Sequence, residues 1–163
     1  MDLTGTLADD TRTLTLVRQV DIPIEQAWAW LTSPDRLAMW YGRWSGYPSR
    51  GHVMVSMDTD TPDAMQLRHD ILALEKPSLL SVRTGEDEQE CLVTVRLRGR
   101  MNCTQIEFSQ TNLDAEALPS LGPAWEWYLD RFVAACAGVS LPTMDEFESD
   151  YMSMATDYLE LVH

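Results

Sequence analysis

The stretch GPAWEWYLDRFVAACAG, residues 122–138, decides the expected fold. Gly-Pro suits the first turn of a helix, and the closing glycine suits its end. At about 1.5 Å per residue, the roughly fifteen residues between them span about 22 Å, enough to cross a sheet. One side of this helix is apolar and carries Trp125, Tyr128, Leu129, Phe132, Val133 and Cys136. We therefore expect one long helix that packs this side against a sheet.

Before this helix, the apolar pattern changes to the alternation that is typical of β-strands. Strands are expected at 13–20, Gly42–Tyr47, His52–Asp58, Met65–Glu75, Leu79–Thr84, Glu90–Arg98 and Met101–Asn112. Two short helices are expected between the first strand and the rest, because Trp28 and Trp40 each lie on an apolar stripe of helical period. Short turns join the later strands, which predicts an antiparallel meander. The predicted class is α+β, with a curved sheet of about six to seven strands.

The C-terminal segment predicts a further helix over Met144–Val162. Its apolar stripe is Phe147, Tyr151, Met154, Tyr158 and Leu161, and acids occupy the other faces. We divide the chain into an N-terminal extension (1–11), one domain (12–138) and an acidic amphipathic C-terminal extension (139–163). The last either packs on its own domain or offers its stripe to a partner, such as a second copy in a homodimer.

Composition narrows the class of protein. The chain of 163 residues has 26 acidic and 12 basic residues, a net charge of −14, which argues against binding nucleic acid. Cys91, Cys103 and Cys136 are an odd number without metal-ligand spacing, so neither a disulfide framework nor a zinc site is expected. No apolar run approaches the roughly 18 residues of a membrane span, and the first residues do not resemble a secretion signal. The expected location is the cytoplasm.

Several segments resemble one known family. They are 17–23 (VRQVDIP), 27–37 (AWAWLTSPDRL), 40–41 (WY), 72–80 (LALEKPSLL), 104–110 (TQIEFSQ) and Trp125 with 129–132 (LDRF). In this order, the chain resembles the SRPBCC or START-like superfamily, also called helix-grip or Bet v 1-like. Within it, the chain is similar to the branch named after the activator of the heat-shock protein 90 ATPase. The resemblance covers about residues 12–138, and Gln110 stands where many relatives carry a histidine.

The resemblance implies a ligand site between the long helix and the concave face of the sheet, a usual place for an apolar pocket with a few polar anchors. Helix stripe and strand parity place eight candidate ligand-binding residues there: Arg18, His69, Phe108, Gln110, Trp125, Tyr128, Leu129 and Phe132. Trp40 and Trp44 are expected near its mouth, which completes a set of ten candidates. Each has a simpler interpretation. The aromatic residues suit plain core packing, Arg18 suits an ion pair with a carboxylate, and His69 suits a hydrogen-bonded core position.

The sequence contains none of the motifs HExxH, GxSxG, GxxxxGK[ST] or GxGxxG. We therefore expect no catalytic residues, metal or organic cofactor. The leading hypothesis is non-enzymatic binding of a small hydrophobic or amphipathic molecule. One alternative, drawn from START-like relatives, is a cyclase- or aromatase-like enzyme that orients a polyketide-like substrate with Arg18, His69 and Tyr128. The other is a protein-interaction or chaperone-activator-like module that uses the acidic C-terminal extension.

Overall fold

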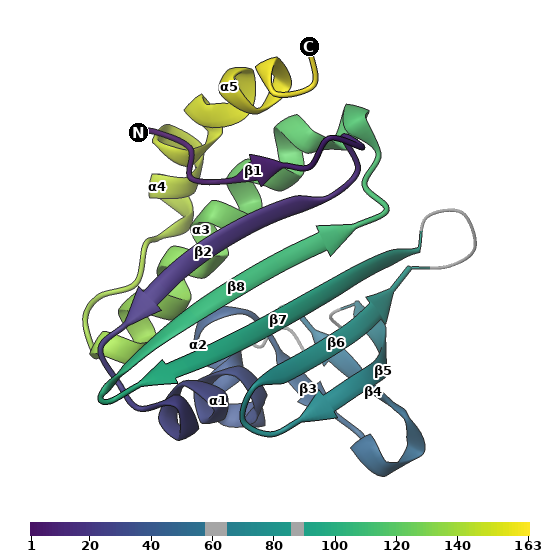
Figure 1. Cartoon of the computed structure of the whole chain (residues 1–163), viewed down its shortest axis with the longest axis vertical. Helices are drawn as coiled ribbons and strands as arrows, with labels where there is room; N and C mark the ends of the chain where they lie inside the picture. The colour runs from purple at the N-terminus through teal and green to yellow at the C-terminus, as the bar shows by residue number, and fades with distance from the viewer. Residues whose placement is uncertain (58–64, 86–89) are drawn as a thin grey trace.

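A computed structural model describes residues 1–57, 65–85 and 90–163 (Figure 1). These residues form one eight-stranded antiparallel sheet in the order β1-β2-β8-β7-β6-β5-β4-β3. Its strands are β1 (Thr6–Leu7), β2 (Leu14–Val20), β3 (Arg43–Ser45), β4 (His52–Ser56), β5 (Gln66–Glu75), β6 (Leu79–Thr84), β7 (Cys91–Arg100) and β8 (Cys103–Thr111). The predicted α+β class with a curved antiparallel sheet is confirmed. The end of the expected strand His52–Asp58 lies outside the described residues.

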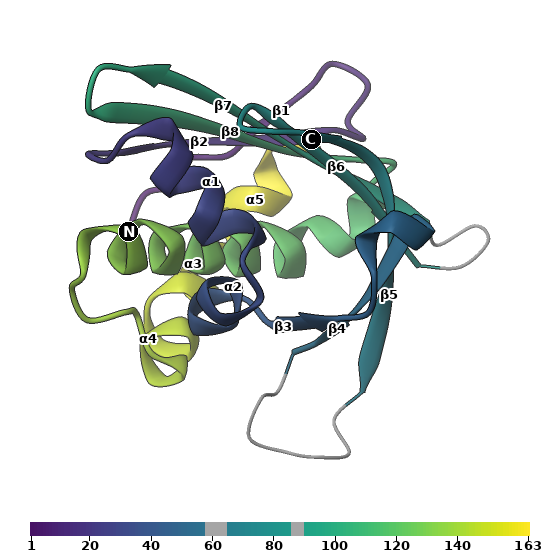
Figure 2. The same ribbon diagram turned by 90° about the horizontal axis from the view of Figure 1, so that it is seen from below.

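The helices are α1 (Ile24–Thr32), α2 (Pro34–Trp40), α3 (Leu118–Ala137), α4 (Met144–Ser149) and α5 (Ala155–Glu160), with short 3-10 turns η1 (Pro48–Arg50), η3 (Ala115–Ala117) and η4 (Tyr151–Met154). Figure 2 shows the sheet curving over α3, with α1 and α2 beside α3. The long helix therefore lies in the concavity of the sheet, as the sequence predicted.

One more strand is present than the sequence indicated. Strand β1 has two residues and pairs Thr6 with Thr15 and Leu7 with Leu14 of β2. Two residues are too short for an alternating pattern to be recognised. Strand β1 adds an edge strand next to β2. It lies within residues 1–11, which we expected to form an N-terminal extension outside the domain.

The long helix begins at Leu118, earlier than the expected start at Gly122-Pro123. Pro119 occupies the first turn, where a proline is tolerated, and Pro123 lies inside the helix. Gly122 has a packing role, since a Cβ there would lie 2.5 Å from ring atoms of Tyr158. Sequence reasoning interpreted Gly122 as a helix start, but its lack of a side chain leaves room for the ring of Tyr158. The expected end is confirmed at Gly138, which has a left-handed φ of 69°.

The prediction of one helix over Met144–Val162 was wrong. A capping box of Thr143 and Glu146 starts α4, and the 3-10 turn η4 then separates α4 from α5. This tighter turn lets the segment follow the surface of its own domain. Tyr151, Met154 and Tyr158 are at most 4% exposed and belong to the main core.

Candidate functional site

A cavity of about 620 Å³ lies between α3 and the concave face of the sheet. Helix α3 contributes Leu121, Trp125, Leu129 and Phe132 to its lining. Opposite them, the inward residues of β7 and β8 are Val93, Val95, Ile106, Phe108 and Gln110. The volume lies within the roughly 300–1,000 Å³ that small-molecule sites occupy, and its lining is mostly apolar.

Eight of the ten candidate residues line this cavity: Trp40, Trp44, His69, Phe108, Gln110, Trp125, Leu129 and Phe132. Strand alternation placed the strand residues on the inner face, because successive side chains of a strand point to opposite sides. The helical period placed the residues of α3 in the same way. Arg18 and Tyr128 lie outside the lining.

The indoles of Trp40, at the end of α2, and Trp44, on the edge strand β3, are anchored by hydrogen bonds. Trp40 donates from Nε1 to the carbonyl of Trp30 at 2.9 Å, and Trp44 donates to the carbonyl of Thr32 at 2.8 Å. Trp40 also packs edge-on against Phe132, with ring centroids 5.0 Å apart. Both donors are thus satisfied by backbone carbonyls, and the rings present apolar surface to the cavity.

His69 and Tyr41 form a polar pair in the lining. His69 is 5% exposed, its Nδ1 lies 3.1 Å from the carbonyl of Leu67, and its Nε2 lies 3.3 Å from the hydroxyl of Tyr41. A carbonyl only accepts, so Nδ1 carries the proton, and burial lowers the pKa of the imidazole so that it is neutral near pH 7. Tyr41 then donates to Nε2. Burial raises the pKa of Tyr41, which suits a hydrogen-bonding group rather than an acid.

Gln110 and Trp125 form the second polar contact. The indole Nε1 of Trp125 donates to Oε1 of Gln110 at 2.6 Å, while its ring packs on Phe108 with centroids 4.2 Å apart. Gln110 is 4% exposed. The bond fixes the amide with its oxygen toward α3, because an indole can only donate.

Arg18 faces the opposite side of α3, where its side chain is largely buried. Its Nη2 lies 2.6 Å from Glu126 and its Nε lies 2.9 Å from Asp130. Burial alone would lower the pKa of the guanidinium, but the hydrogen bonds and charges of Glu126 and Asp130 together outweigh that effect and raise it. The ion pair that the sequence left open is therefore formed, and the group is directed away from the cavity.

Glu126 is the centre of a hydrogen-bond network on this side of α3, which we call the rear network. Sequence reasoning did not identify Glu126. The side chain is 1% exposed and accepts from Thr4, Gly5, Arg18 and Tyr158 at distances of 2.5–3.0 Å. Burial would raise the pKa of the carboxyl, but the bonds from Tyr158, Thr4 and Arg18 outweigh it and lower the pKa. Its partners come from remote parts of the chain, and no local pattern could reveal them.

Tyr128 packs among aromatic rings beside the cavity. Its ring lies 5.3 Å from Tyr41, 5.8 Å from Trp125 and 4.9 Å from Trp127. Burial raises the pKa of its hydroxyl. The arrangement that the enzymatic alternative requires, with Arg18, His69 and Tyr128 around one space, is not formed, because His69 alone of the three lines the cavity.

A β-bulge adds a lining residue that alternation does not predict. Between β5 and β6 the register shifts, so Ile71 pairs with Val82 and Ala73 pairs with Ser81. The extra residue in β5 reverses the parity beyond it, and Leu74 lines the cavity together with Ile71. Sequence reasoning also did not assign the α1 residues Leu31 and Thr32 to the lining.

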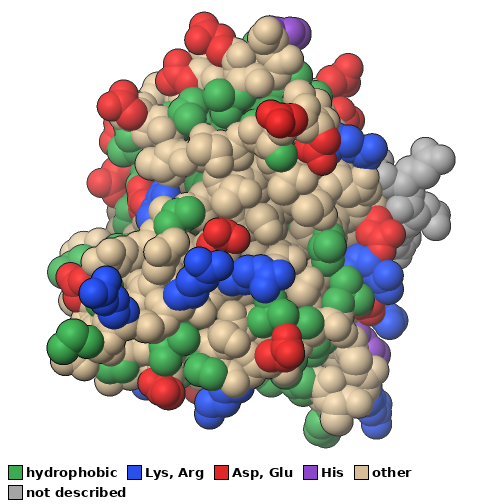
Figure 3. Space-filling model, in the orientation of Figure 1, with side chains coloured by type: hydrophobic (Ala, Val, Ile, Leu, Met, Phe, Trp, Pro, Cys, Tyr) green, Lys and Arg blue, Asp and Glu red, His purple; other side chains and the backbone are tan. Residues whose placement is uncertain are grey.

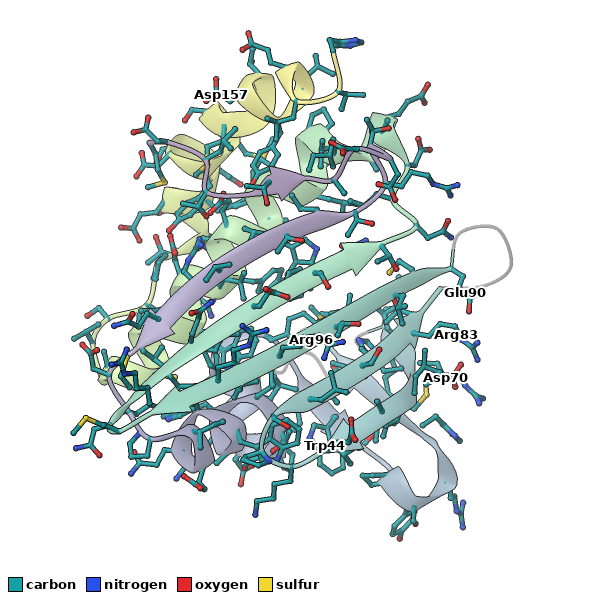
Figure 4. The ribbon with its side chains drawn as sticks, in the orientation of Figure 1. Trp44, Asp70, Arg83, Glu90, Arg96 and Asp157 are labelled. Atoms are coloured by element: carbon teal, nitrogen blue, oxygen red, sulfur yellow. The ribbon has the colours of Figure 1, made fainter. Side chains whose placement is uncertain are left out.

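Charged side chains gather outside the cavity. Asp70, which follows His69 and faces the outer side of the sheet, accepts from Arg68 at 2.8 Å and from Arg83 at 3.3 Å. Arg83 also bonds Glu90 at 2.7 Å, and Figure 4 shows Asp70, Arg83 and Glu90 close together at the same end of the neighbouring strands β5, β6 and β7. In Figure 3, acidic side chains crowd the end that carries α4 and α5. The described residues include no cluster of three or more His, Cys, Asp or Glu side chains that could hold a metal, and none of their helices could cross a membrane.

A long helix gripped by a curved sheet, with a ligand-sized cavity between them, defines the helix-grip class. The sequence model of the family described as "Activator of Hsp90 ATPase homolog 1-like protein" matches residues 21–137. The chain belongs to this family, within the SRPBCC superfamily. The resemblance seen in the sequence is therefore confirmed. A search of curated proteins gives no match.

Solved structures share the fold. CalU16 from Micromonospora echinospora superposes with a TM-score of 0.73 at 21% identity, covering 99% of this chain and 96% of that one. The protein encoded by gene BPP1335 of Bordetella parapertussis gives 0.75 at 20% identity, covering 96% and 91%. DynU16, a protein of the dynemicin biosynthetic locus, gives 0.64 at 21% identity, covering 75% of this chain and 46% of that one. At these identities the likeness establishes the fold alone.

Proposed function

We propose that this protein binds a small, predominantly apolar molecule in the cavity between α3 and the sheet, without transforming it. The observation that carries the proposal is the cavity itself, a space of about 620 Å³ lined by aromatic and aliphatic side chains. An interior of this size left open costs packing energy, since protein cores are otherwise close-packed. A ligand that fills it would recover those contacts.

The polar groups of the lining favour ligand binding over catalysis. His69 is held by Leu67 and Tyr41, and the raised pKa of Tyr41 makes its hydroxyl a weak proton donor. The cyclase-like alternative loses two of its three residues, because Arg18 is engaged by Glu126 and Asp130 and Tyr128 lies beside the cavity.

The interaction-module alternative also loses support. It needs the stripe of the C-terminal extension to be available to a partner. Tyr151, Met154 and Tyr158 of that stripe are buried against their own domain, and Tyr151 donates to Asp130 at 2.7 Å. A partner would have to displace these contacts before it could use the stripe.

Titration with N-phenyl-1-naphthylamine, whose emission rises in apolar surroundings, tests the proposal. Val95 lines the cavity and is 6% exposed, so Val95→Trp places an indole within it. We expect binding by the wild type and a loss of affinity of about tenfold or more in this variant. Val17→Trp is the matched control, because Val17 is 45% exposed on the outer face of β2, and it should bind as the wild type does. Absence of binding, or equal affinity in all three proteins, would refute the proposal.

A further inference from the structure

The lining of the cavity contains a hydrogen-bond donor that has no partner among the described residues. Gln110 uses Oε1 to accept from Trp125, which leaves its Nε2 hydrogens directed elsewhere. No hydrogen bond from Nε2 to any described residue is present, although the side chain is 4% exposed. This amide group therefore depends on water or on a bound molecule for its remaining hydrogen bonds.

The neighbours of Gln110 leave the cavity as the direction for this donor. On β8, Gln110 lies opposite Leu14 of β2 on one side and Val93 of β7 on the other. Both are apolar, so neither side chain can accept a hydrogen bond. No fully enclosed side-chain nitrogen or oxygen of the described residues lacks a partner, so Nε2 must retain some open surface. Because Gln110 lines the cavity, the cavity is the space into which this surface can open.

We propose that the ligand is an uncharged apolar molecule with a carbonyl or similar hydrogen-bond acceptor, and that this acceptor binds the Nε2 amide of Gln110. The inference rests on the proposed function and specifies its ligand. Phe108 and Trp125, whose rings pack beside Gln110, favour a flat ring system next to the acceptor. An ionic group at this depth would find no counter-ion, since the charged lining residue, Lys76, is exposed at the rim of the cavity.

Two probes test this inference, 2-acetylnaphthalene and 2-ethylnaphthalene. The first has a carbonyl where the second has a methylene. Their dissociation constants should be measured for the wild type and for Gln110→Leu, which keeps the volume and removes the donor. We expect the ratio of the two constants to change by about five- to tenfold in the variant, through weaker binding of the ketone. An equal change for both probes would overturn the inference and leave the proposed function intact. If neither probe binds to the wild type, both the inference and the proposed function fail.

Gln110→Leu also removes the acceptor of the Trp125 indole, so a second variant is needed. Trp125→Phe deletes that indole donor and keeps the amide of Gln110. The preference for the ketone should persist in Trp125→Phe, and its loss there would contradict the assignment to Gln110. The infrared carbonyl stretch of 2-acetylnaphthalene bound to the wild type gives a measurement independent of variant folding. It should lie below its frequency in an alkane, and an unshifted band would overturn the inference.

Discussion

On one side of α3, Trp125, Leu129 and Phe132 border an open space; on the other, Glu126 and Asp130 are held by side chains from several other segments. Both sides contain buried residues, Leu129 and Phe132 on one and Glu126 on the other, but these residues are buried in different ways. The rear side fixes the position of the helix, because each oxygen of Glu126 has more than one donor. The side that carries Trp125, Leu129 and Phe132 borders the cavity and leaves that space open. A helix can border an open cavity without collapsing into it when its other side is held so firmly.

If this contrast is right, the largest loss of stability should come from Glu126. Glu126→Gln removes one of the two carboxylates that pair with Arg18. It also places an amide NH2 in a site whose partners include the guanidinium of Arg18 and the backbone N–H groups of Thr4 and Gly5, which can only donate. We expect a loss of about 3–5 kcal/mol in the free energy of unfolding, measured by urea denaturation at pH 7. Asp157→Asn makes the same change of charge at an exposed position of α5 (Figure 4) and should alter stability by about 0.5 kcal/mol or less.

Comparing the stability of the wild type and Glu126→Gln at different pH values also tests the role of the charge, because the expected pH dependence has a definite sign. The pKa of Glu126 is lowered on folding, so the stability that it supplies is complete above its unfolded pKa of about 4.5. It is lost as the pH falls through the lower folded value. The difference between the wild type and Glu126→Gln should therefore shrink below about pH 4.5. A difference that stays constant down to pH 3 would show that the charge is not responsible.

Gly122→Ala should have the next largest effect. In most helices this change is stabilising, because glycine is a poor helix former. Here a Cβ would meet the ring of Tyr158 at 2.5 Å, and we expect a loss of about 1–3 kcal/mol. Urea denaturation measures it. In a Tyr158→Ala background the clash is absent, so the same substitution should become neutral or stabilising; a loss in both backgrounds would refute the explanation.

Enlarging an inward valine distinguishes the open space from the packed core. Val95 lines the cavity, whereas Val20 is 3% exposed in the core and lies outside the lining. Val20→Phe should cost about 1–3 kcal/mol by overpacking, and Val95→Phe should cost less than about 1 kcal/mol because there is room for the ring. Thermal or urea unfolding measures both. Equal losses would mean that the space is closed in solution.

The smallest effect should come from His69, on the cavity wall. Burial lowers its pKa, so the neutral form is the one that the folded state accepts. Its contribution to stability is present above the unfolded pKa of about 6.5 and decreases as the pH falls below that value toward the folded pKa. His69→Gln should flatten the decline in stability between about pH 6.5 and 5. A decline of the same steepness in both proteins would assign it to other groups.

Much of the cavity could be predicted from the sequence because local rules govern it. Alternation placed His69, Phe108 and Gln110 on one face, and the helical period placed Leu129 and Phe132 opposite them. Leu74 was missed because a bulge reverses the parity of β5, and a bulge has no reliable local signature.

The rear network was missed for a different reason. Sequence reasoning left open an ion pair for Arg18, but it could not identify Glu126, whose partners lie 32 to 122 residues away along the chain. The start of α3 and the break between α4 and α5 depend on the same long-range packing. Gly122 resembles a helix start until the ring of Tyr158 is placed over it.

The shared bonds of Glu126 also affect how the molecule opens. Thr4 and Gly5 near one end of the sequence and Tyr158 near the other bind the same carboxylate, and Figure 1 shows both ends of the chain on the same side of the molecule. Detachment of either segment removes donors from a buried anion, which weakens the hold on the other. We therefore expect residues 1–5 and 151–160 to behave as one cooperative unit, whose amide protons exchange with solvent through a common opening event.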